Sequence, residues 1–401
     1  MAKILPWLGR RDRGHHARIY VCDLLVEGGR KTPATIAKRW PGGNVQALQQ
    51  LLGQSPWDYE RVRRAVCNLI LKELPPDKPV WIIDDTAFPK KGSHSVGVAH
   101  QYCGTLGKVA NCQVAVSLNY ATRNACFPVD FSLYLPESWT ENPARRRKVG
   151  IPPDVEFRPK WQLAIQLIDR GLDWELPCGP VLADAVYGRI PEFRKALQQR
   201  ELHYVVGVDS TTRVTLPATT SAPSQGPDGF EIYPGDAERD TALAVALRSV
   251  AWEEVTWREG TKGALKSRFW AGRVLAEEGE VWLLAEWPVN SRQPEKFWLS
   301  DLPADTPLAE LVYYAKSRWW VEQNYQQLKT ELGLDHYEGR TWLGWHHHVT
   351  LVMVAFGFLV LELIRAKKNG IGDHPEPAAD SAGVHNPAGK ILSHVSSHSP
   401  K

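Results

Sequence analysis

The sequence predicts an α/β protein in which a mixed sheet with helices on its faces is interrupted by a mostly β insertion and flanked by helical segments. Three observations predict this class. Residues 17–73 have the apolar spacing of helices, residues 80–208 change from a strand meander to strands alternating with helices, and residues 209–304 contain Trp-rich alternating segments. The chain has 401 residues, 43% of them hydrophobic and 23% charged, which is enough for two or three domains and excludes a largely disordered protein.

The first 72 residues are basic as well as helical. They hold thirteen Lys and Arg against five Asp and Glu, a net charge of +8 in a chain whose total is +3. A basic N-terminal region of this kind is typical of proteins that bind a polyanion, which is most often DNA or RNA and less often an acidic membrane. A basic surface that is only solvated explains the charge equally well. Asn44 can cap a helix that Gly53 ends, which suits a helix-turn-helix or a helical hairpin that only packs. We expect residues 1–78 to form a helical DNA-binding region.

Cysteine usage and hydropathy indicate a cytoplasmic protein. The six cysteines include no C-x-x-C pair, and the N-terminal residues lack the apolar run of a secretory signal. The longest apolar run, residues 349–364, contains Glu362 and is short for a membrane span. We therefore expect a buried helix there and no membrane partner.

Two groups of metal-ligating residue types are expected to be structural. Consecutive helix residues point about 100° apart, so the three histidines at 346–348 cannot converge on one ion. We expect them to pack or to contact DNA. Cys103, Cys112 and Cys126 lack the spacing of zinc ligands and are expected to be buried thiols.

The elements of the core follow a proline-rich boundary at residues 75–79. VWIID is expected to be a short buried strand that ends at an acidic pair, and a Gly turn at 104–107 is expected to join two longer strands. From residue 160 onward the pattern alternates between helix and strand. The expected strands are 80–84, 97–122 around the turn, 127–136, 179–184 and 203–208, and the expected helices are 160–172 and 191–200.

The remaining half of the chain, from residue 209 onward, divides into an insertion, helices and a tail. Residues 211–227 are expected to be loop, followed by Trp-rich strands, and one long helix is expected from about Leu308 to Leu332. The expected division is 1–78 helical and basic, 79–208 first part of the core, 209–304 β-rich insertion, 305–345 core helix, 346–368 C-terminal helix and 369–401 disordered tail.

Three places carry carboxylates toward a shared site. Asp84 and Asp85 follow one expected strand and Asp184 follows another, and sites in open α/β sheets collect beyond strand carboxyl ends. On the expected long helix, with Arg318 at 0°, Glu322 lies at about 40° and Lys329 at about 20°. The same face holds Leu311, Tyr314 and Tyr325, so the three ionised groups interrupt an apolar stripe and require partners.

Clustered carboxylates repel one another, and a hard divalent cation such as Mg²⁺ neutralises them best. Two such ions about 4 Å apart support in-line displacement at phosphorus, with Arg and Lys holding phosphate oxygens. Each part also has a structural explanation. An Asp after a strand is often a helix cap, and Arg318 with Glu322 is an ordinary i, i+4 ion pair.

Several long strings then resemble bacterial insertion-sequence transposases of the DDE superfamily, the "DDE superfamily endonuclease" type. The resemblance runs from about Ala17 to Glu362 and implies an RNase H-like core, a β insertion before the catalytic Glu, and cut-and-paste transposition of DNA. The strings that carry it are IIDDTAFPKKG (82–92), SVGVAHQYCGTLGKVANCQVAVSL (95–118), LPESW (135–139), LADAVYG (182–188) and SRWWVEQNYQQLKTELGLDHYEGRTWLGWHHH (317–348).

The resemblance assigns roles to five residues. Asp85, Asp184 and Glu322 match the catalytic, metal-binding triad, and Arg318 and Lys329 match the phosphate-positioning residues of the helix motif. Asp85 is preferred over Asp84 because neighbouring strand residues face opposite ways and the family's Asp precedes Thr. The family's Tyr three residues before the Arg is replaced by Ala315, with Tyr314 one position away.

Further DNA contacts are expected around this site. In related enzymes a Trp of the insertion stacks on a flipped base, since stacking stabilises an unpaired base. Six tryptophans are candidates for that role: Trp252, Trp257, Trp270, Trp282, Trp287 and Trp298. The expected phosphate contacts, each of which a solvated loop explains equally well, are Lys90, Lys91, Arg145, Arg146 and Arg147, with Lys148 completing the basic run.

The resemblance thus implies a Mg²⁺-dependent transposase with two ions, for which Mn²⁺ can substitute. Its partners are the double-stranded DNA of transposon ends and target, bound by a homodimer in the bacterial cytoplasm at the nucleoid. Water first releases a 3′ hydroxyl, which then attacks DNA. Analogy with relatives that have this helix motif leaves a hairpin intermediate open. The alternatives are a catalytically silent DNA-binding protein of the same fold, or an RNase H-like nuclease without strand transfer.

Overall fold

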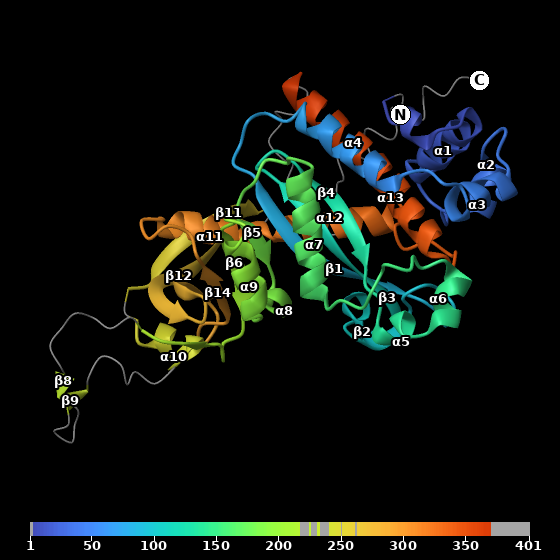
Figure 1. Cartoon of the computed structure of the whole chain (residues 1–401). Helices are drawn as coiled ribbons and strands as arrows, with labels where there is room; N and C mark the ends of the chain where they lie inside the picture. The colour runs from blue at the N-terminus through green and yellow to red at the C-terminus, as the bar shows by residue number, and fades with distance from the viewer. Residues whose placement is uncertain are drawn as a thin grey trace. The chain divides into compact units, whose positions relative to one another are not determined.

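The computed structural model describes residues 3–216, 224–225, 231–232, 240–249, 251–260 and 263–369 (Figure 1). The chain forms two compact units. The larger unit comprises Met1–Pro79, Asp84–Leu176 and Trp320–Lys401, and the smaller unit comprises Val80–Ile83 and Pro177–Trp319. Strand β1 (Val80–Pro89) begins in the smaller unit and continues in the larger. The tail predicted at 369–401 lies, beyond its first residue, outside the described residues.

The N-terminal helices of the larger unit confirm the helical prediction. Asn44 caps α3 through a hydrogen bond from the Ala47 N–H to its Oδ1 at 2.9 Å, and the helix ends at Gly53, both as predicted. Helices α1, α3 and α4 pack against the C-terminal helix α13. After the short turn η1 (Leu5–Leu8), the helices are α1 (Arg11–Leu24), α2 (Pro33–Arg39), α3 (Val45–Gly53), α4 (Tyr59–Leu71) and α13 (Trp342–Lys368).

Helix α13 is the buried helix that the apolar run predicts. It is long and apolar enough to cross a membrane by length and composition, yet 67% of its most apolar window is buried within the fold. The three histidines at its start pack in different directions. His347 stacks on Trp57 with ring centroids 3.7 Å apart, and His348 Nδ1 lies 2.8 Å from the Tyr20 hydroxyl. The prediction that these histidines pack is confirmed.

Acid is expected to weaken the larger unit through His348. In its neutral form the ring accepts a hydrogen bond from the Tyr20 hydroxyl at Nδ1 and donates one through Nε2 to the carbonyls of Gly333 and Leu334, each at 3.2 Å. Burial lowers the pKa of His348 to about 3. In the unfolded chain His348 takes up a proton below about pH 6.5, whereas in the folded chain it stays neutral down to about pH 3. The free energy of unfolding therefore falls as the pH drops from 6.5 toward 3. By pH 5 the loss amounts to about 2 kcal/mol. Urea unfolding at pH 7 and pH 5 checks this against His348→Gln, which keeps both kinds of hydrogen bond. An equal pH dependence in the two proteins would contradict it.

The larger unit also contains an antiparallel meander. Strand β3 pairs with β2 on one side and with β4 through a bulge between Leu118 and Asn119, and α7 packs on β3 and β4. The three predicted thiols Cys103, Cys112 and Cys126 are free and buried here. The elements are β2 (Ala99–Cys103), the turn η2 (Gly104–Leu106), β3 (Lys108–Ala121), β4 (Cys126–Leu133), α7 (Lys160–Asp173) and two short unpredicted helices, α5 (Glu137–Thr140) and α6 (Pro143–Val149).

The prediction that the first strand ends at its acidic pair is wrong. Strand β1 continues to Pro89, so Asp84 and Asp85 lie in its middle. The reason is that Thr86, Ala87 and Phe88 are all buried and favour or tolerate extended backbone, so the pairing does not stop at the two charges.

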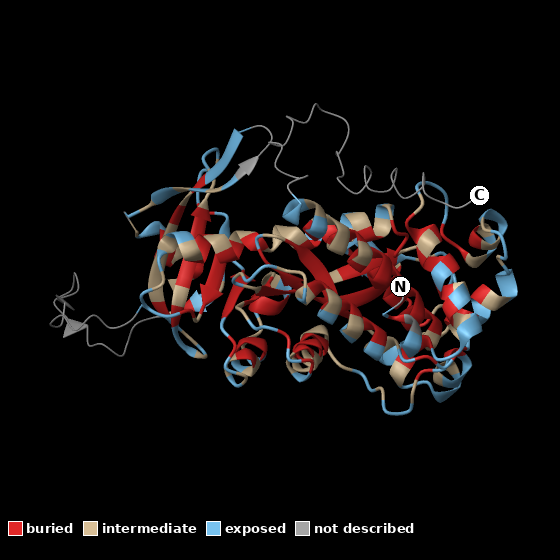
Figure 2. Ribbon diagram, turned by 90° about the horizontal axis from the view of Figure 1, so that it is seen from above, coloured by how far each residue is buried: buried red, intermediate tan, exposed pale blue. Residues whose placement is uncertain are grey.

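The smaller unit builds a sheet from parallel and antiparallel strands. The start of β1 is parallel to β5 (Val181–Ala183), with Trp81 opposite Val181, and β5 is parallel to β6 (Tyr204–Val208). The short strands β5 and β6 are buried along their length. Figure 2 shows that buried residues are concentrated in the strands at the centre of the fold. The predicted strand 179–184 and the strand 203–208 are thereby confirmed. Helices α8 (Ala185–Gly188), α9 (Pro191–Gln198) and α11 (Leu308–Ser317) belong to this unit.

The Trp-rich insertion continues the same sheet. Strand β14 pairs antiparallel with β6, with Phe297 opposite Val208, and β13, β12 and β11 follow in order. With parallel and antiparallel pairs together, the predicted mixed α/β class is confirmed. The insertion comprises β11 (Glu253–Gly260), β12 (Gly263–Ala276), β13 (Gly279–Trp287), β14 (Lys296–Ser300), α10 (Ala242–Leu247), the pair β7 (Arg213–Val214) with β10 (Asp240–Thr241), and the pair β8 (Ser224–Gln225) with β9 (Glu231–Ile232).

The prediction of one helix from Leu308 to Leu332 is also wrong. Helix α11 ends at Ser317 and α12 (Trp319–Thr330) begins after Arg318. The Ser317 hydroxyl donates to the Tyr313 carbonyl at 2.7 Å, a bond that competes with the helix ladder and bends helices. Leu311 and Tyr314 therefore belong to α11, whereas Glu322, Tyr325 and Lys329 belong to α12.

Candidate active site

Asp85 is the more accessible member of the acidic pair in β1. Asp84 is only 9% exposed, and its Oδ1 accepts the backbone N–H of Asp85 at 2.7 Å. The side chain of Asp85 is 23% exposed, and its Oδ2 pairs with the ammonium of Lys160, the first residue of α7. The alternation used to prefer Asp85 thus agrees with the burial of Asp84.

Lys160 is a site residue that the sequence analysis missed. The helix at 160–172 is readable from its apolar spacing, but nothing in the spacing connects its first residue with a strand 75 positions earlier. Pro159 before it is the one local signal, since it marks where the helix begins. A lysine beside a candidate metal ligand neutralises that carboxylate when no ion does.

Helix α12 packs onto β1, the strand that carries Asp85, and onto β3. Lys329 donates to the Ala87 carbonyl at 2.9 Å and to Thr105 Oγ1 at 3.0 Å, and burial lowers its pKa. Tyr325 and Ser117 share a hydrogen bond of 2.6 Å between their hydroxyls. Glu322 lies one turn before Tyr325 and is exposed. The larger unit therefore brings Lys329 to the same strand as Asp85, two residues further along it.

Asp184 follows β5 in the smaller unit and acts as a helix cap. Its Oδ1 accepts the Val186 N–H at 2.9 Å, which begins α8. Two glycines fix this turn. A Cβ on Gly188 would lie 2.0 Å from the Gly207 carbonyl oxygen, and one on Gly207 would lie 3.1 Å from the Ala185 nitrogen. The string LADAVYG therefore ends in Gly because α8 touches β6 there.

The three predicted metal ligands are individually suitable for a divalent cation. In the part of the chain that the structure describes, no three His, Cys, Asp or Glu side chains come together as ligands of one ion. Asp85, Asp184 and Glu322 nevertheless present carboxylate oxygens, the donors that Mg²⁺ prefers. Asp85 also attracts a cation already, since the Lys160 ammonium occupies its Oδ2. The donor chemistry therefore fits a divalent ion.

The predicted phosphate-binding residues divide into engaged and exposed groups. Lys90 donates to the Tyr337 carbonyl at 2.6 Å, and burial lowers its pKa to about 8. Arg145 lies 3.5 Å from the Trp139 ring centroid and donates to the Ser93 carbonyl, and Arg146 donates to the Pro152 carbonyl at 2.7 Å. Lys91 and Arg147 are exposed. Arg318 is half-buried at the break before α12.

The six candidate tryptophans are not equivalent. Trp298 is 9% exposed, and Trp257 lies under the Lys316 ammonium at 4.6 Å. Trp252 contacts Trp287 and Trp270 with ring centroids 5.3 and 6.5 Å apart. Trp282 donates to the Pro303 carbonyl at 3.1 Å. All except Trp298 are half-buried, so burial separates one of the six from the rest.

The strands, the acidic pair and the LADAVYG turn define a class of protein. A sequence profile described as "DDE superfamily endonuclease" matches residues 3–264, and the chain belongs to this family. Enzymes of this superfamily generally use divalent metal ions. The match includes Asp85 and Asp184 and ends before α12, so it does not reach Glu322.

One relative is similar to this chain over most of its length. Over 307 residues the chain is 28% identical to the "Probable transposase for insertion sequence element IS701" of Microchaete diplosiphon, covering 76% of this chain and 71% of that protein. Among solved structures, the NurA nuclease from Sulfolobus solfataricus is 9% identical, with 63% of this chain and 79% of that one covered and a TM-score of 0.24.

Proposed function

We propose that this chain is a DNA transposase that moves an insertion sequence by cut-and-paste transposition. The observation that carries the proposal is the position of Asp184. It follows β5, which is parallel to both of its neighbours, β1 and β6, and sites of open α/β sheets lie beyond the carboxyl ends of such strands. Membership of the endonuclease family and the IS701 relative support the same activity.

The proposed catalytic residues are Asp85, Asp184 and Glu322, which would hold two Mg²⁺ ions, with Mn²⁺ as a substitute. When bound, the ions supply activation of the attacking oxygen and stabilisation of the leaving one. Arg318 and Lys329 hold phosphate oxygens. Lys329 has one N–H left after its two hydrogen bonds in the fold, and that N–H is available to a phosphate.

The reaction proceeds in two displacements at phosphorus. In the first, water attacks, the P–O3′ bond at the element end breaks, and the departing oxygen takes a proton to become a 3′ hydroxyl. In the second, this 3′ hydroxyl attacks a phosphorus of target DNA and breaks its P–O3′ bond, which joins element and target. The substrates are double-stranded element ends and target DNA, bound by a homodimer in the cytoplasm at the nucleoid.

The DNA contacts proposed around the site depend on which basic side chains are exposed. Lys91 and Arg147 are free to approach a backbone, whereas Lys90, Arg145 and Arg146 would have to exchange their carbonyl partners for a phosphate. A base-stacking Trp is proposed among the half-buried Trp252, Trp257, Trp270, Trp282 and Trp287.

A cleavage and joining assay tests the proposal. Labelled duplexes that carry the ends of the element are incubated with the protein, a target plasmid and Mg²⁺ or Mn²⁺. A transposase yields cut ends with a 3′ hydroxyl and then joined products. Binding without any product would identify a catalytically silent DNA-binding protein, and cutting without joining would identify a nuclease.

A further inference from the structure

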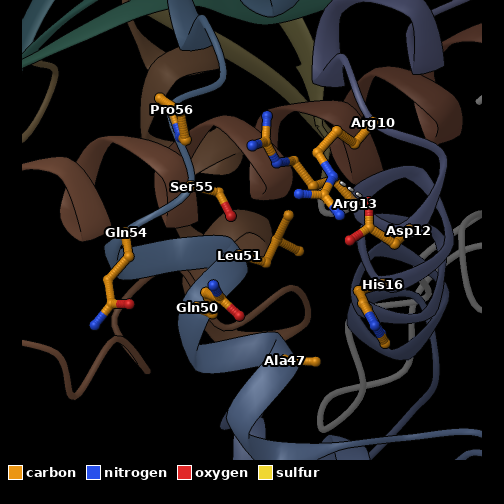
Figure 3. Close-up of a pocket in the computed structure, with 10 residues that line it drawn as sticks. All are labelled: Arg10, Asp12, Arg13, His16, Ala47, Gln50, Leu51, Gln54, Ser55 and Pro56. Atoms are coloured by element: carbon orange, nitrogen blue, oxygen red, sulfur yellow. Dashed lines mark hydrogen bonds and ion pairs between the residues drawn. The ribbon is translucent and has the colours of Figure 1, made fainter.

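A small polar cavity lies between the first and third helices of the larger unit. It has a volume of about 130 Å³, and α1 and its cap contribute Arg10, Asp12, Arg13 and His16, while α3 contributes Gln50 from the opposite wall (Figure 3). Residues 10, 13 and 16 recur every three positions, which places them on one side of the helix. The cavity is thus lined by hydrogen-bond donors from two independent elements.

The charges of this lining leave one positive charge unmatched. Arg10 and Arg13 contribute two, and Asp12, which pairs with Arg10 at 3.2 Å, removes one. Burial, followed by the neighbouring His15, lowers the pKa of His16, so this ring is neutral at pH 7. A ligand with a single negative charge would complete the balance.

Arg13 has unused hydrogen-bonding capacity at the cavity. A guanidinium has five N–H donors, and in the described part of the chain Arg13 makes one long hydrogen bond of 3.4 Å, to the Leu8 carbonyl. A ligand that accepts hydrogen bonds from this guanidinium is therefore favoured.

We propose that this cavity holds one backbone phosphate of the DNA that the protein acts on. A phosphodiester carries a single negative charge and oxygens that accept hydrogen bonds from Arg13 and Gln50, and a cavity of about 130 Å³ is large enough for a phosphate group. The inference rests on the proposed function and adds to it a contact remote from Asp85 in the sequence. It also separates the basic residues of the N-terminal region by role: Lys31 and Arg63 are buried inside the fold, whereas Arg10 and Arg13 face the cavity.

The salt dependence of DNA binding tests the proposal. The probe is a fluorescein-labelled duplex of arbitrary sequence, because a phosphate contact is independent of sequence. Its Kd for the full chain is measured by anisotropy over a series of NaCl concentrations. For Arg13→Ala, the slope of log K against log[NaCl] is expected to become about 0.9 less negative, which corresponds to about eightfold weaker binding at 0.1 M NaCl.

Three further variants sharpen the result. Asp12→Asn removes the opposing carboxylate and is expected to tighten binding several-fold, the reverse of Arg13→Ala. Gln50→Ala removes a neutral donor and is expected to weaken binding with an unchanged slope. Arg11→Ala removes an exposed charge from the same helix outside the cavity and is expected to leave the slope close to that of the wild type.

The outcomes separate this inference from the proposed function. If the wild-type protein binds the duplex but Arg13→Ala keeps its slope, or Arg11→Ala changes the slope equally, the cavity is not a phosphate site and the proposed function stands. If the wild-type protein does not bind duplex DNA at all, both fail. If inorganic phosphate at millimolar concentration displaces the duplex from the wild type but not from Arg13→Ala, the site takes free phosphate as well as DNA, which supports the chemistry.

Discussion

Asp184→Asn is expected to reduce metal-dependent cleavage of element ends by at least about a thousandfold, equivalent to about 4 kcal/mol of transition-state stabilisation. Asparagine caps a helix as well as aspartate does, so the hydrogen bond to the Val186 N–H and the start of α8 are kept. The variant therefore removes the negative charge that would hold a cation and leaves the turn intact. The measurement is the rate of nicking of a labelled duplex in Mg²⁺, with duplex binding followed in parallel.

The control for this variant is Asp173→Asn. Asp173 is an exposed acid at the end of α7 and has no place in the proposed site, so its loss is expected to leave the rate unchanged. Asp85→Asn and Glu322→Gln are expected to match Asp184→Asn. Full Mg²⁺-dependent nicking by Asp184→Asn would exclude it from the active site.

Asp130→Ala is expected to destabilise the larger unit by about 3–5 kcal/mol. Asp130 is 1% exposed and lies between two arginines, with Oδ1 on Arg63 and Oδ2 on Arg170. Arg63 is fully buried and also donates to Thr350 Oγ1 at 2.7 Å. Removing the carboxylate leaves a buried guanidinium without its counter-charge. Urea unfolding followed by circular dichroism measures the loss.

Two controls show whether the buried charge is the cause. Glu338→Ala breaks the exposed pair between Arg30 and Glu338, whose 2.7 Å contact is solvated, and is expected to cost less than about 1 kcal/mol. The double variant Arg63→Met with Asp130→Leu removes both charges and is expected to be more stable than Asp130→Ala. A loss below 1 kcal/mol for Asp130→Ala would mean that water reaches Arg63.

The sequence predicts local features well because they depend on neighbouring residues. The cap at Asn44, the end of α3 at Gly53 and the strand before Asp184 are set by short-range chemistry, and the structure has them at those positions. The separation of Asp84 from Asp85 follows from strand alternation in the same way.

Features that depend on distant partners could not be predicted. The sequence analysis places Arg63 among the charges of a basic surface, but in the fold Arg63 is buried and paired with Asp130, 67 residues away. Lys160 becomes a partner of Asp85 only when the fold brings α7 to β1. The break at Arg318 follows from the side-chain bond of Ser317 to Tyr313, which helical periodicity does not report. The spacing of apolar residues predicts which face of a helix or strand is buried, but it does not predict which charged side chains pair in the interior.

The contact of Gly188 with Gly207 has a consequence for how copies of an insertion sequence lose their activity. Because even one methyl group at position 188 would collide with a carbonyl 2.0 Å away, Gly188→Ala would displace the turn that carries Asp184. A single codon change would thus silence a genomic copy while every acid of the proposed triad is still encoded. Surveys that judge whether a copy is mobile from its acidic residues alone would score such a copy as intact.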